Sequence, residues 1–476
     1  MDARQSTPDA SYAAALNYLY GRINYERSPG GPPRGRGLSL DRMRKLLAKL
    51  GDPQDALRVI HVAGTKGKGL TAAMIAAVLA EAGMQIGLYT SPHLERLEER
   101  VQIGGVAISS QELVELVDAI RPVVDELDHE AAITAGLARP TFFEITTALA
   151  LLVFAQRHVD AAVVEVGLGG RLDSTNVCQP QIAVITSISL DHTRQLGNTL
   201  SQIAIEKAGI IKQGVPVVSG VTQAEPRRAI ADIAQQLAAP AIWLGDDFCF
   251  RYQPAEAVDL LDSAGGSIDF EATFGGQSLA LTDLRLGMLG SHQAVNAAVA
   301  LATLQQLRID GWQIPDSALR RGLAATSCHA RVEVVSRQPT VVLDTAHNVA
   351  SVEALLAVLD ESFAAQRRIL VFAATRDKDV KGMLKRLLPR FELIILTRYA
   401  DNPRAVPPCE LFAMTESLLA ESPHVCEVVI HEQPEAAWQH CQTVVTVEHL
   451  VVVTGSFFLA AEIRPVITSA RAVTLS

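Results

Sequence analysis

Short apolar runs alternate with longer amphipathic segments over the first half of the chain. The runs lie at residues 59–63, 85–89, 161–166 and 182–188, and each ends in a turn-forming or polar segment. Apolar runs of this length predict buried strands, and the longer segments with helical periodicity predict helices between them. Strands that alternate with helices favour a parallel sheet with helices on both faces. This part of the chain is therefore expected to be an α/β domain.

The pattern changes between Trp243 and Leu286, where short alternating segments and glycines predict a small antiparallel addition. Further along, the strand and helix pattern starts again with an apolar run at 340–343. Polar groups again follow the predicted strands, as ligand groups do in open α/β sheets. We therefore expect two domains, residues 1–326 and a smaller one at 327–476.

Composition limits the classes of function. The 476 residues carry a formal net charge of -10, which argues against nucleic-acid or anionic-membrane partners, because both need a basic surface. The six cysteines form no CxxC pair, and neither an export signal nor a membrane-length apolar stretch is visible. We expect a cytoplasmic protein and, without an obvious association motif, a monomer.

The segment from Val59 to Thr71 has the pattern of a phosphate-binding loop. A buried strand leads into a turn with glycines at 64, 67 and 69, and a helix is predicted from Thr71 to Ala82. Backbone N–H groups in such a turn can face an anion, and Lys68 can reach the β- and γ-phosphates. The spacing is unusual, because Gly69 and Leu70 follow Lys68, whereas a Ser or Thr commonly follows the lysine directly. A hydroxyl for a metal ion must therefore come from Thr71 or from elsewhere. A glycine-rich turn without a ligand would give the same local pattern.

Polar residues lie near the ends of three of the predicted strands. Ser91 comes after the second strand, Glu165 lies in an otherwise apolar strand, and His192 follows the next strand. A carboxylate in a buried run needs a partner or a metal ion, and oxygen ligands suit magnesium. The charged loop from Gly167 to Asn176 suits a binding site. For Glu144, a structural role competes with a role in ligand binding, because Thr141 and Glu144 are spaced as a helix capping box.

An ordered set of motifs makes the chain resemble the folylpolyglutamate synthase and dihydrofolate synthase family of Mur-ligase-like, ATP-dependent amide ligases. The likeness extends from His61 to Arg464. Its motifs are His61–Gly69, Tyr89–Leu94, Thr141–Glu144, Glu165–Asn176, Leu190–Thr193 with Leu196-Gly, Glu206–Ile210, Ser291–Ala297, Arg331–Glu333, Asp344–Asn348 and Thr454–Ser456. Each motif is weak alone, and their common order makes the resemblance specific.

The resemblance implies a P-loop ATPase domain followed by a smaller Rossmann-like, glutamate-ligase α/β domain. It also implies a reaction in which ATP phosphorylates the carboxylate of a folate or of dihydropteroate. The amine of L-glutamate then attacks the acyl phosphate. A site shared between two domains would need closure, which excludes water from that intermediate.

The resemblance assigns roles residue by residue. Catalytic roles fall on Lys68, Lys207, His192, Arg331 and His347. Nucleotide binding falls on Gly64, Thr65, Lys66, Gly67, Lys68, Gly69, Thr71, Asn296, Arg331 and Asp344. Substrate binding falls on Thr141, Phe142, Phe143, Glu144, Leu172, Asp173 and Ser174. Metal ligands are Ser91, Glu165, His192 and a carbamylated Lys207, for two magnesium ions, with room for a monovalent cation.

The sequence departs from the family at four places. Lys66 replaces a usual Asn, Leu70 replaces a usual Ser or Thr, and Ser327–Ala330 replaces a usual Trp-Pro-Gly segment. The early loop with Arg34 and Arg36 does not match the segment that contacts dihydropteroate in some bifunctional members. Two alternatives therefore stay open: another Mur-like amide ligase, acting on a peptidoglycan precursor, and a non-catalytic nucleotide-binding homologue.

Overall fold

The computed structural model describes residues 10–26, 39–134, 138–258, 265–400, 402–421 and 424–474. The chain divides into two compact units, which are described separately. The first unit contains residues 1–251, 269–282 and 295–323, and the second contains 252–268, 283–294 and 324–476. The domain boundary expected at 326/327 remains a prediction, and sequence reasoning did not assign the two inserted segments to the second unit.

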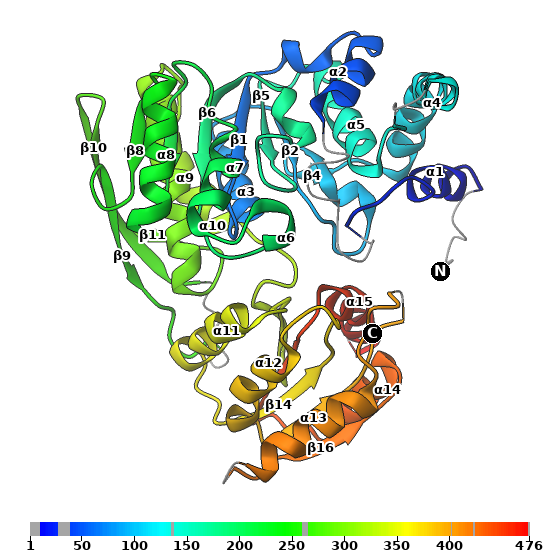
Figure 1. Ribbon diagram of the computed structural model, residues 1–476. Coiled ribbons are helices and arrows are strands. Elements are labelled where there is room, and N and C mark those ends of the chain that lie inside the picture. Colours follow the sequence, from blue (N-terminus) through cyan, green and yellow to red (C-terminus); the bar gives the residue numbers. More distant parts are fainter. Residues whose placement is uncertain are drawn as a thin grey trace. The chain divides into compact units, whose positions relative to one another are not determined.

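An eight-stranded sheet forms the centre of the first unit (Figure 1). Its strands, in spatial order, are β4 (Val106–Ala107), β3 (Val101–Ile103), β2 (Ile86–Tyr89), β5 (Ala161–Glu165), β1 (Val59–Ala63), β6 (Pro180–Ile185), β7 (Val217–Ser219) and β8 (Ala241–Trp243). In this spatial order, each neighbouring pair from β2 through to β8 is parallel. Strand β3 is antiparallel to both of its neighbours, β2 and β4. The carboxyl ends of β1, β2, β5 and β6 therefore meet at one edge.

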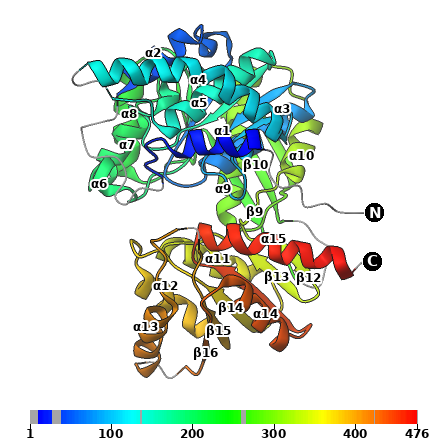
Figure 2. The same cartoon turned by 90° about the vertical axis from the view of Figure 1, so that its right-hand side faces the viewer.

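Helices cover the sheet as the alternating pattern predicted. They are α1 (Ala10–Tyr20), α2 (Leu40–Lys49), η1 (Pro53–Ala56), α3 (Lys68–Glu81), η2 (Leu97–Arg100), α4 (Ser110–Ile133), α5 (Phe142–Gln156), η3 (Ser174–Val177), α6 (Thr193–Leu196), α7 (Leu200–Ala208), α8 (Ala224–Gln236), α9 (Ser291–Ile309) and α10 (Asp316–Ala325). Helices α2, α4 and α5 pack together over one core cluster (Figure 2), and α7 and α8 pack together over another.

Two predicted boundaries were wrong by three residues. Helix α3 begins at Lys68 and not at Thr71, because Gly67 takes the left-handed conformation that starts the helix (φ 83°). Strand β6 ends at Ile185 and not at Ile188. The next two residues, Thr186 and Ser187, use their hydroxyls to donate to the carbonyl of Lys66, so they support the glycine-rich loop that follows β1.

A separate three-stranded sheet accounts for the change of pattern after Trp243. Its order is β11 (Gln277–Arg285), β10 (Ser267–Phe274) and β9 (Phe248–Gln253). The predicted small β addition is therefore present.

The second unit contains a six-stranded sheet in the order β12 (Glu333–Arg337), β13 (Thr340–Leu343), β17 (His449–Thr454), β14 (Arg367–Phe372), β15 (Leu393–Leu396) and β16 (Glu427–Ile430). All neighbours are parallel except β12 with β13. The helices are α11 (Val349–Ser362), α12 (Val380–Leu387), η4 (Leu388–Arg390), α13 (Pro408–Ala420), α14 (Pro434–Val444) and α15 (Phe457–Thr474).

The inserted segments contribute to the core of the second unit. Val258 and Leu289 are buried in the same cluster as Leu355, Leu370 and Val452. Within the described ranges, no helix is long and apolar enough to cross a membrane.

Candidate functional site

The glycine-rich loop follows β1 and is held by the chain that follows β6. Thr186 Oγ1 and Ser187 Oγ donate hydrogen bonds of 2.6 and 3.0 Å to the carbonyl of Lys66. The amide of Thr65 donates to the carbonyl of Ser187 at 2.7 Å. A Cβ at Gly64 would lie 1.9 Å from Thr186 Oγ1, so only glycine fits this approach. The loop shape is thus fixed by neighbouring residues of the chain.

Asn296 of α9 lies against the same loop. A Cβ at Gly67 would lie 2.1 Å from Asn296 Oδ1, and Gly67 has a φ of 83°. Glycine is therefore required for both space and conformation. The structure thus brings together Asn296 and the loop, 229 residues apart by their numbers, as two parts of the predicted nucleotide site.

The first turn of α3 contains Leu70, which replaces the usual Ser or Thr, and Thr71, the other predicted source of a hydroxyl. Leu70 is buried and contributes to the core. Thr71 is also buried, and its Oγ1 has no hydrogen-bond partner among the described residues. A buried hydroxyl without a partner is costly unless a ligand or ion completes it.

Lys207 of α7 is buried below the phosphate loop. Its Nζ donates a hydrogen bond of 2.8 Å to the carbonyl of Gly64. Burial lowers the pKa of Lys207 to about 7, and the charge of Lys68 acts in the same direction. The carboxylates of Asp191 and Asp173 oppose this shift. A substantial part of the Lys207 amine is therefore neutral near pH 7 and nucleophilic.

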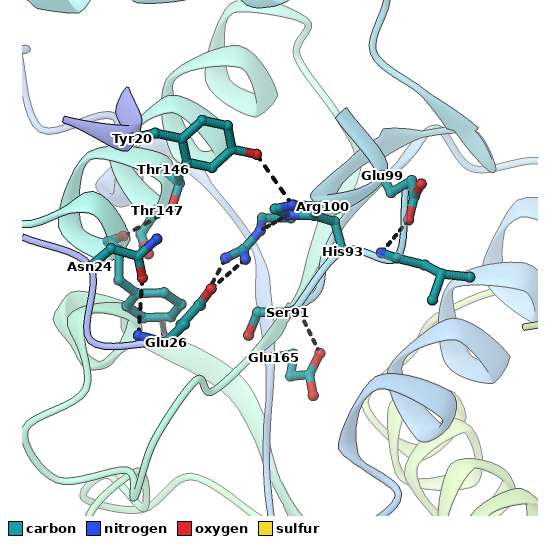
Figure 3. A network of polar contacts seen from close by, with 12 residues as sticks. Tyr20, Asn24, Glu26, Ser91, His93, Glu99, Arg100, Thr146, Thr147 and Glu165 are labelled. Carbon is teal, nitrogen blue, oxygen red and sulfur yellow. Dashed lines mark hydrogen bonds and ion pairs between the residues drawn. The ribbon is translucent and has the colours of Figure 1, made fainter. Parts of the chain in front are cut away.

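Glu165, at the carboxyl end of β5, is the predicted buried carboxylate. Its Oε2 accepts a hydrogen bond of 2.9 Å from the amide of Ser91, which follows β2 (Figure 3). A Cβ at Gly69 would lie 3.1 Å from the same oxygen, so Glu165 also lies beside the first turn of α3. The structure therefore brings Ser91, Glu165 and the phosphate loop together.

His192 is placed differently from the other predicted metal ligands. It precedes the short helix α6 with a φ of 47°, and its side chain is 57% exposed. Its Nε2 lies 4.0 Å from Asp191 Oδ1. Among the residues that the structure describes, no three His, Cys, Asp or Glu side chains are grouped as a ready metal site. The four-residue ligand set remains a prediction.

The predicted capping box is present at the start of α5. Thr141 Oγ1 accepts from the amide of Glu144, while Glu144 Oε2 accepts from the amide of Thr141 at 2.8 Å. Arg42 of α2 also donates to both Glu144 oxygens, at 3.0 and 3.2 Å. Glu144 therefore has a complete structural role, and Arg42 is a partner that the sequence pattern did not reveal.

Aromatic rings surround the two predicted phenylalanines. The ring of Phe142 stacks on Tyr20 with centroids 5.6 Å apart, and the ring of Phe143 lies 6.2 Å from that of Tyr89. Phe143 also fills the space beside Gly167, where a Cβ would lie 2.4 Å from its ring. These contacts make an apolar wall next to the Gly167–Asn176 loop.

A buried polar chain links that loop to β1. Asp173 accepts hydrogen bonds from the amides of Leu168 and Thr175 and from Thr175 Oγ1, the last at 2.6 Å. The hydroxyl of Thr175 lies 2.8 Å from His61 Nε2. Since Thr175 donates its proton to Asp173, His61 must donate from Nε2. Leu172 and Ser174 flank Asp173 and are half-buried.

The ionisation of this chain follows from its burial. Burial raises the pKa of Asp173, against the hydrogen bonds it accepts and the charge of Lys68. Burial also lowers the pKa of His61 to about 3, with a further contribution from Lys212. His61 is therefore neutral at physiological pH. Sequence reasoning used His61 only as part of a motif and did not predict this contact.

A second unpredicted network lies beside Ser91 (Figure 3). Arg100 is fully buried and pairs with Glu26 through two hydrogen bonds of 2.9 and 2.5 Å. Its Nε donates to His93 Nδ1 at 2.8 Å, and His93 Nε2 lies 3.3 Å from the hydroxyl of Tyr20. This network ties the segment after α1 to the turn that contains Ser91. Arg34 and Arg36, the loop residues named from the sequence, lie outside the described residues.

Three predicted residues belong to the second unit. Asp344 follows β13, and its two oxygens accept from the amides of Ala346 and Val332 at 2.6 and 2.9 Å. Burial raises the pKa of Asp344, while the charge of Arg331 and these two hydrogen bonds lower it. Arg331 is exposed between the buried residues Ala330 and Val332. His347 Nδ1 lies 2.9 Å from the carbonyl of Thr345, at the same carboxyl end of the sheet.

Comparison with known proteins relates this geometry to a family. Residues 117–304 match the Mur ligase middle domain, and residues 330–457 match the Mur ligase glutamate ligase domain. A dihydrofolate synthase/folylpolyglutamate synthase of Bacillus subtilis (strain 168) is 37% identical over 456 residues, covering 95% of this chain and 98% of the relative. The chain belongs to the folylpolyglutamate synthase and dihydrofolate synthase family. The family resemblance inferred from the motifs is confirmed.

Other members of the folylpolyglutamate synthase and dihydrofolate synthase family agree with this assignment. The dihydrofolate synthase/folylpolyglutamate synthase of Escherichia coli (strain K12) is 32% identical, covering 91% of this chain and 92% of the relative. A structure of Mycobacterium tuberculosis folylpolyglutamate synthase complexed with ADP has a TM-score of 0.84 and 31% identity, covering 96% of this chain and 98% of that one. The predicted Mur-ligase fold, with an ATPase domain and a smaller α/β domain, is confirmed.

Proposed function

We propose that this chain is an ATP-dependent ligase that adds L-glutamate to a folate through an acyl phosphate. The B. subtilis relative is named for this activity and for dihydrofolate synthesis, and the E. coli FolC structure in complex with DHPP and ADP is 29% identical with a TM-score of 0.78. We extend the proposal to dihydropteroate as a second acceptor of glutamate.

The observation that supports the proposal most is the phosphate loop with its neighbours. The loop is preshaped by Thr186 and Ser187, and Lys68 begins the helix that follows it. The helix N-terminus and Lys68 would stabilise the negative charge of the phosphates as it shifts during transfer. Asn296 lies against the same loop and would contact the nucleotide. Arg331 and Asp344 would supply further nucleotide contacts.

Magnesium is the metal ion that this reaction would need, and several residues fit it. Glu165 is a buried carboxylate beside Ser91, and Thr71 has a buried hydroxyl without a partner among the described residues. We propose that Ser91, Glu165, His192 and a carbamylated Lys207 hold magnesium. Bound magnesium would neutralise charge on the nucleotide phosphates.

Lys207 fits a carbamate because its amine is buried and its pKa is near 7. A neutral amine can attack carbon dioxide, whereas an ammonium cannot. The new bond between Nζ and the carbon of carbon dioxide would form with release of one amine proton to water, and the resulting carbamate anion suits a metal ligand better than the ammonium cation does.

We propose that the Gly167–Asn176 loop and the apolar wall around Phe142 and Phe143 bind the pterin end of the folate. The half-buried ring of Phe143 would present apolar surface, and the buried residues Phe142 and Asp173 would support the wall and the loop from behind. Glu144 and Thr141 would support this wall through the capping box and Arg42.

The test is a coupled assay of ADP release with ATP, magnesium and L-glutamate. Dihydropteroate is offered in one reaction and tetrahydrofolate in another, and a peptidoglycan precursor in a third. Release that requires both a folate and glutamate would support the proposal. Release with the peptidoglycan precursor alone would favour the other class of Mur ligase, and no release from folded protein that binds ATP would favour a non-catalytic homologue.

A further inference from the structure

Arg331 lies in a turn with an unusual backbone. Its two neighbours, Ala330 and Val332, have φ angles of 54° and 47°. L-residues rarely adopt this left-handed region, and a β-branched valine there is a clear outlier. Both neighbours are buried, whereas Arg331 is exposed. The turn thus projects one arginine outward from two strained, buried residues.

Strained residues persist only where their surroundings hold them. Each strained residue here is held by a carboxylate that accepts from its amide. Glu333 Oε2 accepts from the amide of Ala330 at 2.7 Å, and Asp344 Oδ2 accepts from the amide of Val332 at 2.9 Å. The conformation on both sides of Arg331 is therefore fixed by these two acids.

Glu333 is itself held by a residue far away in the sequence. Arg464 of α15 donates from Nε and Nη2 to Glu333 at distances of 2.8 to 3.2 Å. The two side chains are only 16% and 20% exposed, and His329 Nδ1 also lies 3.2 Å from Glu333 Oε1. An Arg–carboxylate pair with several hydrogen bonds is more rigid than a single contact.

We propose that Glu333 and Arg464 are positioning residues for Arg331. Arg464 orients the carboxylate of Glu333, and that carboxylate keeps Ala330 in the left-handed conformation from which Arg331 projects. Asp344 completes the arrangement on the other side of Arg331. This inference depends on the proposed function in one respect, which is that Arg331 contacts the nucleotide.

A double-mutant cycle tests the coupling. We expect Arg331→Ala to lower kcat/KM for ATP by about a hundredfold, and Arg464→Met or Glu333→Gln by about tenfold. In the Arg331→Ala background, Arg464→Met should have less than about a twofold further effect, because it acts through Arg331. Losses that multiply in the double variant would overturn the inference.

The matched control is Arg368→Met. Arg368 is a similarly buried arginine of the second unit that pairs with Asp360 at 2.8 Å. We expect it to lower the thermal stability about as much as Arg464→Met does, with kcat/KM for ATP unchanged within about twofold. Equal kinetic losses in the two variants would mean that Arg464 matters only for stability, which would also overturn the inference.

A second measurement does not depend on activity. Hydrogen–deuterium exchange of the peptide that spans 326–334 reports the amides of Ala330 and Val332. We expect exchange to accelerate about tenfold or more in Arg464→Met and in Glu333→Gln, but not in Arg368→Met. Unchanged exchange would overturn the positioning role. If exchange accelerates but Arg331→Ala retains full activity, the positioning of the turn by Glu333 and Arg464 stands, and the nucleotide contact proposed for Arg331 is wrong.

Discussion

Lys207 donates a hydrogen bond of 2.8 Å to the carbonyl oxygen of Gly64, the first glycine of the phosphate loop. The lysine is buried, with its pKa lowered to about 7, although a cation at this position would lie near phosphate groups. The same contact therefore joins the proposed phosphate loop to an amine that the protein keeps partly neutral.

The first prediction concerns that amine. With ¹³C-labelled bicarbonate, we expect the protein to show a carbamate carbon resonance by NMR, because neutral Lys207 attacks carbon dioxide. The resonance should be absent from Lys207→Arg, whose guanidinium stays charged. A resonance of equal intensity in that variant would place the modification elsewhere.

The second prediction concerns Lys68. We expect Lys68→Ala to lower kcat at least about a hundredfold, because a charge that stabilises the transferred phosphoryl group is lost. The side chain is only partly buried, so the melting temperature should change little. Lys66→Asn is the matched control on the exposed neighbour, and we expect a smaller kinetic loss. Full activity of Lys68→Ala would contradict the assignment of the loop.

Leu70 gives a prediction with two opposite effects. We expect Leu70→Ser to tighten the binding of magnesium–ATP, measured by calorimetry, because it restores a hydroxyl to the loop. The leucine is buried, so the same change should lower the free energy of unfolding by about 2–4 kcal/mol. Unchanged affinity would indicate that Thr71 or Ser91 already supplies the hydroxyl.

His61 yields a prediction about acid stability. Its pKa is about 3 in the folded protein and has an ordinary value of 6.5. The unfolded chain therefore binds a proton that the folded chain does not, and stability falls as the pH drops below 6.5. At pH 5 this group should cost about 2 kcal/mol relative to pH 8.

His61→Gln isolates this effect, because the amide can still donate to Thr175 but cannot ionise. Urea unfolding at pH 8 and pH 5 should show a smaller loss of stability for the variant than for the wild type. Identical losses would mean that His61 is not the titrating group. A raised KM for the folate in His61→Leu would further indicate that the link to Asp173 positions the binding loop.

Local pattern sufficed for the strands, the caps and the order of the motifs. Val59–Ala63 is a strand as predicted, and Thr141 caps α5 with Glu144 at the expected spacing. Such features depend on residues within a few positions of one another. The start of α3 was missed because Gly69 is a poor helix former, while the left-handed Gly67 sets the true start.

Contacts between distant residues could not be predicted in this way. His61 meets Thr175 across 114 positions, and Arg42 meets Glu144 across 102. No local periodicity encodes such pairs, because they depend on how the strands are ordered in the sheet. Motif order indicated the family, but the exposed position of His192 and the strained turn around Arg331 are visible only in the three-dimensional structure.

The two inserted segments, 252–268 and 283–294, have a consequence for how this gene can be divided. A fragment that begins at residue 327 would lack Val258 and Leu289, which are buried in the core of the second unit. One that ends at 326 would carry those segments without the core that covers them. No single break in the coding sequence therefore separates the two units. Recombination that exchanges one of them between homologues would need five junctions.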